Sequence, residues 1–337
     1  MVQTELHQRA ARLLTEIGLA APEDIRAVVP LTGGVASDIA RVDLPGRSVA
    51  VKFALPKLKV AADWHAPVHR NRAEYEWLRV AAQAAPGIAP KLYGRSEALH
   101  GFALEFIAGD DVWLWKAGLL EGRRDAGQAA SVGDLLGRVH AASVTRGFDR
   151  EPFANRDDFH ALRLEPYLLY TAQAHPGQAE RLTRLAADLY RAETVLVHGD
   201  VSPKNILFRD AGPILLDAEC ATMGDASFDL AFCLNHLAIK ALHLPQTRAD
   251  LLASVLRLWG AYRPHVTWED AAALEARVCA LLPALMLARV DGKSPVEYLD
   301  DAGRDRLRAI SLTLLPAPPR SLSEFTEQFA HRLEDPS

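Results

Sequence analysis

The hydrophobic and polar positions along the chain fall into two regions with different periodicities. An amphipathic helix comes first, and from about Arg26 to Leu55 β-branched residues fill R-A-V-V-P-L-T and S-V-A-V-K-F between glycine and proline turns. This pattern predicts an antiparallel meander. A helix-like segment from about Arg70 to Ala84 follows, and two short strands, K-L-Y-G-R and F-A-L-E-F-I, bring the region to Gly109.

The second region begins near Val112 and has mostly helical periodicity. One strand-rich stretch interrupts it, with V-L-V-H-G-D, N-I-L-F and P-I-L-L-D in succession. The apolar run from Val278 to Ala288 contains Pro283 and is shorter than the roughly 20 residues that span a bilayer, so we expect a buried helix there. The outline predicts an α+β fold with two lobes, a small antiparallel-sheet lobe over residues 1–107 and a larger, mostly helical lobe over residues 108–337.

Composition narrows the possible partners and the compartment. The formal charge is -5 and no lysine or arginine cluster is present, which disfavours nucleic acid and anionic membranes as partners. The acidic excess lies in the second region and gives only a hint of a cationic substrate. The three cysteines have no C-x-x-C spacing, and the N-terminus shows no signal peptide, so we expect a cytoplasmic protein with neither a disulfide framework nor a zinc site.

The strongest chemical signal is the run H-G-D-V-S-P-K-N, which contains Asp200 and Asn205 on a tight loop between two apolar strands. Asp217 follows at the end of the next apolar strand, in L-L-D-A-E. Phosphoryl transfer needs a carboxylate that orients the acceptor hydroxyl and takes its proton, and it needs oxygen ligands for magnesium. The pattern therefore predicts Asp200 and Asn205 as catalytic residues, and Asn205 and Asp217 as metal ligands.

These motifs resemble the aminoglycoside phosphotransferase and choline kinase family, whose members share the protein-kinase-like fold and carry H-G-D-x-x-x-x-N and a later D-x-E or D-x-G. The resemblance extends from about Leu31 to Leu234. It implies that Asp200 is the catalytic base and that Asn205 and Asp217 bind Mg2+. It also implies that Asp229, in F-D-L-A, steadies the catalytic loop through hydrogen bonds to its backbone.

Two neighbouring side chains have more than one interpretation. His198 directly follows a strand, where a histidine is more often a satisfied core residue than a proton carrier, so we expect it to brace the loop. Glu219 could bind a second metal ion, or it could simply end its strand in solvent.

The first region contains the expected nucleotide site. Lys52 lies in the apolar strand V-A-V-K-F, where a buried ammonium is costly unless it is paired. Kinases pair this lysine with a helix glutamate, and in R-A-E-Y-E-W-L the expected partner is Glu74, with Glu76 as the alternative. A lysine that extends from an edge strand to water is the structural alternative.

Backbone groups complete the predicted nucleotide site, whose cofactors are ATP and Mg2+. Gly33 and Gly34, followed by Ser37, form a turn between the first two strands whose N–H groups could bind phosphates. The strand that includes Glu105 and Ile107 would form the hinge that contacts adenine.

The acceptor is predicted to be a small molecule with a hydroxyl group. Only eleven residues separate Asp217 from Asp229, which leaves no room for the long A-P-E segment on which protein kinases dock a polypeptide. The segment from Lys52 to Pro67 resembles a loop of 5-methylthioribose kinases and favours a sugar or polyol, although those enzymes lack the asparagine found here at Asn205. Trp64 in this segment could cover the nucleotide or pack within the lobe.

The acceptor pocket is expected between helices around residues 228–236 and 278–291, with Asn235, Arg289 and Asp291 as candidate polar groups. Arg289 and Asp291 could equally cap or staple a helix end. Two other functions remain open, an aminoglycoside phosphotransferase and a non-catalytic pseudokinase that serves as a binding module.

Overall fold

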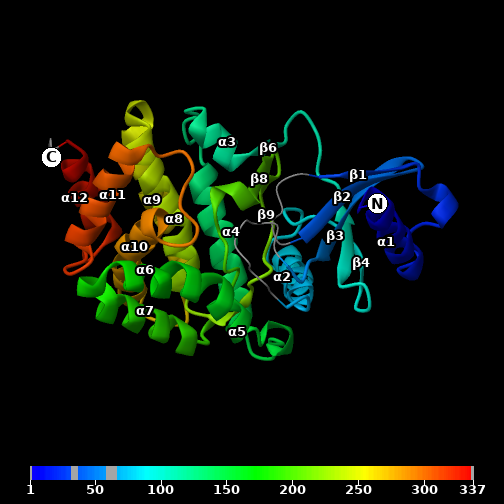
Figure 1. Ribbon diagram of the computed structural model, residues 1–337, viewed down its shortest axis with the longest axis horizontal. Helices are drawn as coiled ribbons and strands as arrows, with labels where there is room; N and C mark the ends of the chain where they lie inside the picture. The colour runs from blue at the N-terminus through cyan, green and yellow to red at the C-terminus, as the bar shows by residue number, and fades with distance from the viewer. Residues whose placement is uncertain (1, 32–36, 58–66, 335–337) are drawn as a thin grey trace.

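A five-stranded antiparallel sheet and two helices form the smaller lobe (Figure 1). The structure is a computed structural model that describes residues 2–31, 37–57 and 67–334. The strands follow the order β1-β2-β3-β5-β4. The elements of this lobe are α1 (Val2–Glu16), β1 (Ala27–Pro30), β2 (Ser37–Leu44), β3 (Arg47–Ala54), α2 (Arg70–Ala84), β4 (Leu92–Ser96) and β5 (Gly101–Glu105).

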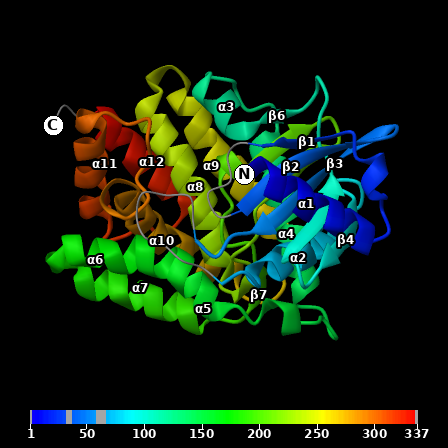
Figure 2. The same cartoon turned by 45° about the vertical axis from the view of Figure 1, so that its right-hand side comes forward.

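The alternation of side chains along β3 decides which residues face each helix. Val49, Val51 and Phe53 pack with buried residues of α1 on one face of the sheet, whereas Ala50 packs with α2 on the other. Because successive strand residues point to opposite faces, Lys52 lies on the same face as Ala50. The two-residue period of β3 therefore points Lys52 toward α2, and Figures 1 and 2 show α1 and α2 on different sides of the sheet.

Helices dominate the larger lobe, and short strands occur where the chain forms its central loop. Its elements are β6 (Trp113–Leu114), α3 (Trp115–Leu120), α4 (Gln128–Ser143), α5 (Arg156–Phe159), the π-helical stretch η3 (His160–Leu169), α6 (Tyr170–Ala174), α7 (Ala179–Arg191), β7 (Val195–Val197), the short turn η5 (Pro203–Asn205), β8 (Ile206–Arg209), β9 (Gly212–Leu215), β10 (Thr222–Gly224), α8 (Ala226–His243), α9 (Arg248–Tyr262), α10 (Ala271–Asp291), α11 (Asp301–Leu314) and α12 (Leu322–Glu334).

Two small sheets frame the central loop of this lobe. Strands β7 and β10 pair antiparallel, and β8 pairs with both β6 and β9. The sequence pattern predicts β7, β8 and β9 but not β6 or β10, whose two and three residues are too short to show a period.

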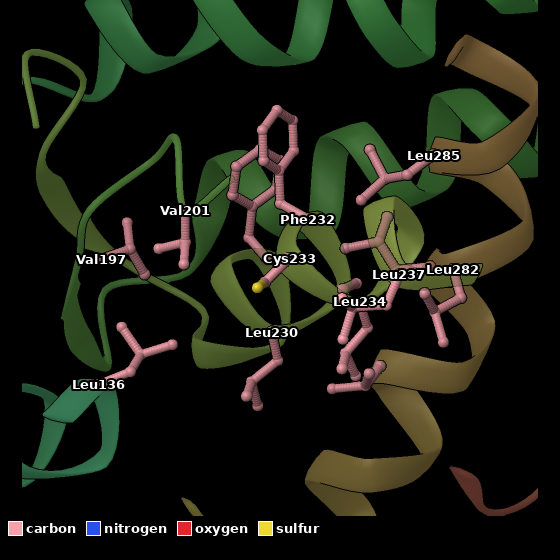
Figure 3. Close-up of a cluster of buried hydrophobic side chains, with 14 of the residues drawn as sticks. Leu136, Val197, Val201, Leu230, Phe232, Cys233, Leu234, Leu237, Leu282 and Leu285 are labelled. Carbon is pink, nitrogen blue, oxygen red and sulfur yellow. The ribbon is translucent and has the colours of Figure 1, made fainter. Parts of the chain in front are cut away.

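Helix α8 is the centre of the large hydrophobic core, because nearly all of its residues are buried. Figure 3 shows side chains of α8 between Val197 and Val201 of the central loop region and Leu282 and Leu285 of α10. Among the described residues, α10 is the one helix long and apolar enough to cross a membrane. However, 61% of its most apolar 18-residue segment is buried inside the protein. It packs against α8 and α11, as expected for the predicted buried helix.

The core of the larger lobe continues into α2 of the smaller lobe. Trp77 and Leu78 of α2 are buried in the same cluster as Leu136 of α4 and Val197 of β7. The helix that faces Lys52 is therefore held by the larger lobe as well as by the sheet. The division at residue 107 stays a prediction.

Candidate active site

Asp229, in the first turn of α8, holds the loop after β7 through hydrogen bonds to the loop backbone. One carboxylate oxygen of Asp229 accepts from the N–H of His198 at 2.6 Å, and the other accepts from the N–H of Gly199 at 2.8 Å. His198 Nδ1 accepts from the N–H of Asp200 at 3.1 Å, and its ring meets Trp77 edge-on at 4.7 Å between centroids. Burial lowers the pKa of His198. Asp229 and His198 thus have the bracing geometry expected of them.

Gly199 gives this loop a backbone conformation and a close approach that other residues do not tolerate. Its φ is +79°, and a Cβ at this position would lie 2.8 Å from the carbonyl oxygen of Cys220. Both features point to a position where only glycine fits.

We expect Gly199→Ala to lower the free energy of unfolding by about 2 kcal/mol, because left-handed backbone strain and a steric clash add at one residue. Urea denaturation checks this value. Gly177→Ala is the matched control, because a Cβ there meets no atom within 4 Å. Equal stability of the two variants would contradict the packing described here.

Asp200 is 2% exposed, and its two carboxylate oxygens have different environments. Oδ2 lies 3.0 Å from Arg163 Nη2 and 3.2 Å from Lys204 Nζ. Oδ1 is buried and has no hydrogen-bond partner among the described residues. Burial alone would raise the pKa of Asp200, but the charges of Lys204 and Arg163 outweigh it and lower the pKa. The side chain is therefore an ionised carboxylate with one oxygen left for a donor.

The β8–β9 hairpin brings Asn205 and Asp217 to one end. Ile206 pairs with Leu215, and the N–H of Leu216 donates to the carbonyl of Asn205 at 2.9 Å. Asn205 Nδ2 donates to the carbonyl of Asp200 at 3.0 Å. Asp217 has φ +71°, a left-handed conformation that is rare outside glycine and typical of functional positions.

Lys52 is paired with Glu74, not with Glu76. Its ammonium lies 2.7 Å from Glu74 Oε2 and 2.8 Å from Oε1, and it also donates to Asp217 Oδ1. Glu76 instead pairs with Arg79 at 2.6 Å on the surface of α2. Burial alone would lower the pKa of Lys52, but Asp217 and Glu74 outweigh it and raise the pKa. The alternative in which this lysine extends to water is wrong, because Lys52 is 6% exposed.

Glu219 is buried and paired, so the alternative in which it ends its strand in solvent is also wrong. Its Oε2 accepts from Arg70 Nε at 2.9 Å, and Arg70 also donates to the carbonyls of Leu55 at 2.9 Å and Pro67 at 2.7 Å. Burial and the nearby charge of Asp217 raise the pKa of Glu219. Its role toward a second metal stays a prediction.

The donor set suits magnesium held jointly by protein and nucleotide. Among the residues the structure describes, no group of three or more His, Cys, Asp or Glu side chains could hold a metal ion. Mg2+ commonly takes one or two carboxylates and completes its shell with phosphates and water. Asn205 and Asp217, which the hairpin holds at one end, fit that requirement.

The predicted backbone contacts to the nucleotide are described only in part. Gly33, Gly34 and Trp64 lie outside the described residues. Ser37 is buried in β2, opposite Ala54. The N–H of Glu105 donates to the carbonyl of Lys91, and its side chain pairs with Arg209 at 3.1 Å, so the predicted adenine contact depends on the backbone that continues to Ile107.

Three charged residues in this site are not predicted by the sequence motifs. Arg163 and Lys204 hold Asp200, and Arg70 holds Glu219. Lys204 lies within the H-G-D-V-S-P-K-N run and could have been found there. Arg163 is the charged residue in the apolar stretch A-L-R-L, a position where burial of a partnered arginine is a reasonable inference.

The three candidate acceptor residues separate into two kinds. Asn235 and Arg289 are buried, and each has one side-chain atom with no hydrogen-bond partner among the described residues. Asp291 instead pairs with His175 at 2.7 Å and with Arg308 at 2.7 Å, so it staples the end of α10 to α6 and α11.

Replacing Asp291 with asparagine should lower the free energy of unfolding by about 1 kcal/mol at pH 7. The hydrogen bond from Arg308 and the one with His175 lower the pKa of Asp291, while burial opposes them. A lowered carboxyl pKa stabilises the fold above the unfolded pKa of about 4 and loses that contribution as pH falls through the folded pKa. Urea denaturation should show a difference in the free energy of unfolding between the wild type and the variant that is smaller at about pH 3 than at pH 7. An equal difference at both pH values would contradict the stabilising role of Asp291.

Comparison with known proteins places this site in a family. A model of the phosphotransferase enzyme family matches residues 27–274. Methylthioribose kinase of Geobacillus thermodenitrificans (strain NG80-2) is 23% identical over 246 residues, which cover 64% of this chain and 61% of that protein. Methylthioribose kinase of Bacillus cereus (strain B4264) is 24% identical over 239 residues, which cover 63% and 60%. The chain thus spans less than two thirds of the length of these curated relatives.

Solved structures confirm the two-lobed, kinase-like α+β fold. A choline/ethanolamine kinase family protein from Mesorhizobium loti superposes with a TM-score of 0.55 at 19% identity and covers 99% of this chain and 100% of its own. An amicoumacin kinase gives 0.56 at 15% identity, with 94% and 97% covered. The family match spans Lys52, Asp200, Asn205 and Asp217. The chain belongs to the phosphotransferase enzyme family, as its motifs predicted.

Proposed function

We propose that this protein is an ATP-dependent kinase that transfers the γ-phosphoryl group to a hydroxyl of a small metabolite, with a sugar or polyol as the favoured acceptor. The observation that carries the proposal is the state of Asp200. One oxygen is fixed by Arg163 and Lys204, and the other is buried with no donor among the described residues. A substrate hydroxyl is the donor that a kinase carboxylate needs.

Asp200 orients the acceptor oxygen toward the γ-phosphorus and receives its proton as the new O–P bond forms and the bond to ADP breaks. Its lowered pKa suits orientation of the hydroxyl more than early proton removal, because a weak base takes the proton late in a loose transition state. Arg163 and Lys204 keep the carboxylate ionised and in place.

The nucleotide phosphates would be bound by the charges around Lys52. Glu74 fixes the ammonium from the α2 side, and Asp217 contacts it from the hairpin side. Asn205 and Asp217 would hold Mg2+, which neutralises phosphate charge when it is bound. ATP as the donor is supported by the amicoumacin kinase of similar fold, which was solved in complex with AMP-PNP and Ca2+.

Two observations support a small-molecule acceptor: the similarity of this chain to methylthioribose kinases and the short connection after Asp217. The match covers about three fifths of the length of those kinases. Between Asp217 and α8 the chain forms only a turn and β10, so no long peptide-docking segment is present in this described stretch.

Coupled ADP release with Mg2+ tests the proposal against a panel of pentoses, polyols, amino alcohols and aminoglycosides. Turnover that depends on a sugar or polyol would support the proposal. Turnover with aminoglycosides alone would favour a resistance enzyme. Absence of Mg2+-dependent nucleotide binding in calorimetry would contradict the kinase function and favour the non-catalytic binding module.

A further inference from the structure

Two buried cations in the larger lobe have no carboxylate partner among the residues that the structure describes. Lys240 of α8 is 1% exposed, and Arg289 of α10 is 8% exposed. The ammonium of Lys240 lies 4.9 Å from the ring centroid of Tyr298 and has no hydrogen bond or ion pair with any residue in the described ranges. Burial of a cation without a countercharge is costly, and natural cores rarely contain one.

Within the described part of the chain, Arg289 has only neutral partners. Its Nη1 donates to the hydroxyl of Tyr167 at 3.2 Å and to Ser294 Oγ at 3.1 Å. Its Nε is buried and has no partner among the described residues. The planar guanidinium can bind a carboxylate or phosphate through two parallel N–H groups.

Nearby charges do not compensate these cations. Lys116 adds a third positive charge, and the one carboxylate that acts on Lys240 from a described residue, Glu297, is already paired with Lys116. Burial is the main cause that lowers the pKa of Lys240 to about 7, and the positive charges of Lys116 and Arg289 lower it further. Burial, followed by Arg289 and Lys240, also lowers the pKa of His236 one turn earlier on α8. The local field is therefore positive.

One more buried polar atom accompanies the cations. The hydroxyl oxygen of Tyr298, whose ring lies beside Lys240, has no hydrogen-bond partner among the described residues. A polar group that is buried and unsatisfied calls for a ligand or ordered water. The group of Lys240, Arg289 and Tyr298 is called the cationic cluster below.

The elements that hold Asp200 also contact the cationic cluster. Tyr167, which contacts Arg289, is one turn beyond Arg163 on η3, and Arg163 holds Asp200. Helix α3, which contains Lys116, packs against the turn η5 that ends the catalytic loop. Elements that hold the catalytic carboxylate therefore also contact the residues of the cluster.

We propose that the acceptor of this kinase contains an anionic group, a carboxylate or a phosphate monoester, which Lys240 and Arg289 bind while the acceptor hydroxyl contacts Asp200. This inference rests on the proposed kinase function and specifies its substrate class. It excludes cationic acceptors such as aminoglycosides and amino alcohols, because a like charge beside Lys240 and Arg289 is repelled. It also replaces the hint of a cationic substrate given by the overall acidic charge.

Matched acceptors separate the anionic group from the rest of the molecule. We would compare kcat/KM for D-ribose, D-ribonate and D-ribose 5-phosphate, for glycerol, glycerate and glycerol 3-phosphate, and for choline. In at least one series, kcat/KM for an acidic acceptor should exceed kcat/KM for the neutral acceptor by about 30-fold or more, because a buried charge pair commonly contributes that much binding free energy. The acidic acceptor with the higher kcat/KM shows whether the site prefers a carboxylate or a phosphate. Equal or better use of the neutral members, or of choline, would overturn the inference.

Variants show whether the cationic cluster causes the preference. Lys240→Met keeps side-chain length and removes an unpaired buried charge, so the fold should be retained. It should raise KM for the acidic acceptor about 10-fold or more and leave KM for MgATP unchanged. Lys293→Met is the charge-matched control, because Lys293 is exposed and paired with Glu165, and it should change neither value. An unaltered acid preference in Lys240→Met would count against the proposal.

Binding measurements keep this inference separate from the kinase function. Calorimetric titration of D-ribonate and D-ribose 5-phosphate should show saturable binding of one anion to the wild-type protein, and Lys240→Met should lose it. If MgATP binds normally and neither anion does, the anionic acceptor is refuted while the kinase function stands. If MgATP fails to bind, the kinase function is refuted, and anion binding alone shows whether the cluster is a binding site.

Discussion

Asp200→Asn lowers kcat by about 1,000-fold and leaves KM for MgATP nearly unchanged, if the carboxylate has the role proposed here. Asparagine has the size of aspartate but cannot take a proton, and its amide would place a donor where the acceptor hydroxyl must donate. The proposed nucleotide contacts, which involve Lys52 and Asp217, should not be altered. Steady-state ADP release with a saturating acceptor measures both constants.

Asp210→Asn is the control for this prediction. Asp210 lies in the exposed turn of the same β8–β9 hairpin, away from Lys52 and Asp200, and its change should leave kcat within about twofold. A kcat for Asp200→Asn within tenfold of the wild type would show that this carboxylate does not orient the acceptor.

Glu74→Gln should lower kcat/KM for MgATP by about 10- to 100-fold, because it removes one of the two carboxylates that fix Lys52. Asp217 would then be the remaining anion against the ammonium. Competition between Lys52 and Mg2+ for Asp217 should increase, so the Mg2+ concentration for half-maximal activity should rise. A magnesium titration of the rate at fixed ATP measures this shift.

Glu76→Gln is a close control for Glu74→Gln. Glu76 is two residues away on the same helix, has the same chemistry and pairs with the exposed Arg79. Its change should affect neither kcat/KM nor the magnesium dependence. Equal losses in both variants would mean that the effect arises from the charge of α2 and not from the pairing with Lys52.

The sequence predicts the parts of this molecule whose signals are local. Alternation along β3 places Lys52 on the α2 face, and the H-G-D-V-S-P-K-N run with its flanking strands predicts the loop of Asp200 and Asn205. The strands β6 and β10 could not be predicted, because two or three residues gain their structure from pairing partners and not from a period.

The remaining features that the sequence does not predict depend on contacts between residues far apart in the chain. Arg163 holds Asp200 from a stretch that is π-helical around Pro166, and such irregular turns lack a sequence period. Glu219 lacks any local sign of its pairing with Arg70 on a helix 149 positions away. Lys240 did offer a signal, because a lysine within the nearly continuous apolar run of α8 must be buried whichever face it occupies.

Phosphorus-31 NMR of a reaction with MgATP and the best acceptor shows whether this protein phosphorylates a hydroxyl group. We expect a new phosphomonoester resonance on the acceptor, in an amount equal to the ADP formed, that requires Mg2+ and is absent with Asp200→Asn. ATP consumption that yields only inorganic phosphate with every acceptor, or an equal phosphomonoester signal from Asp200→Asn, would contradict it.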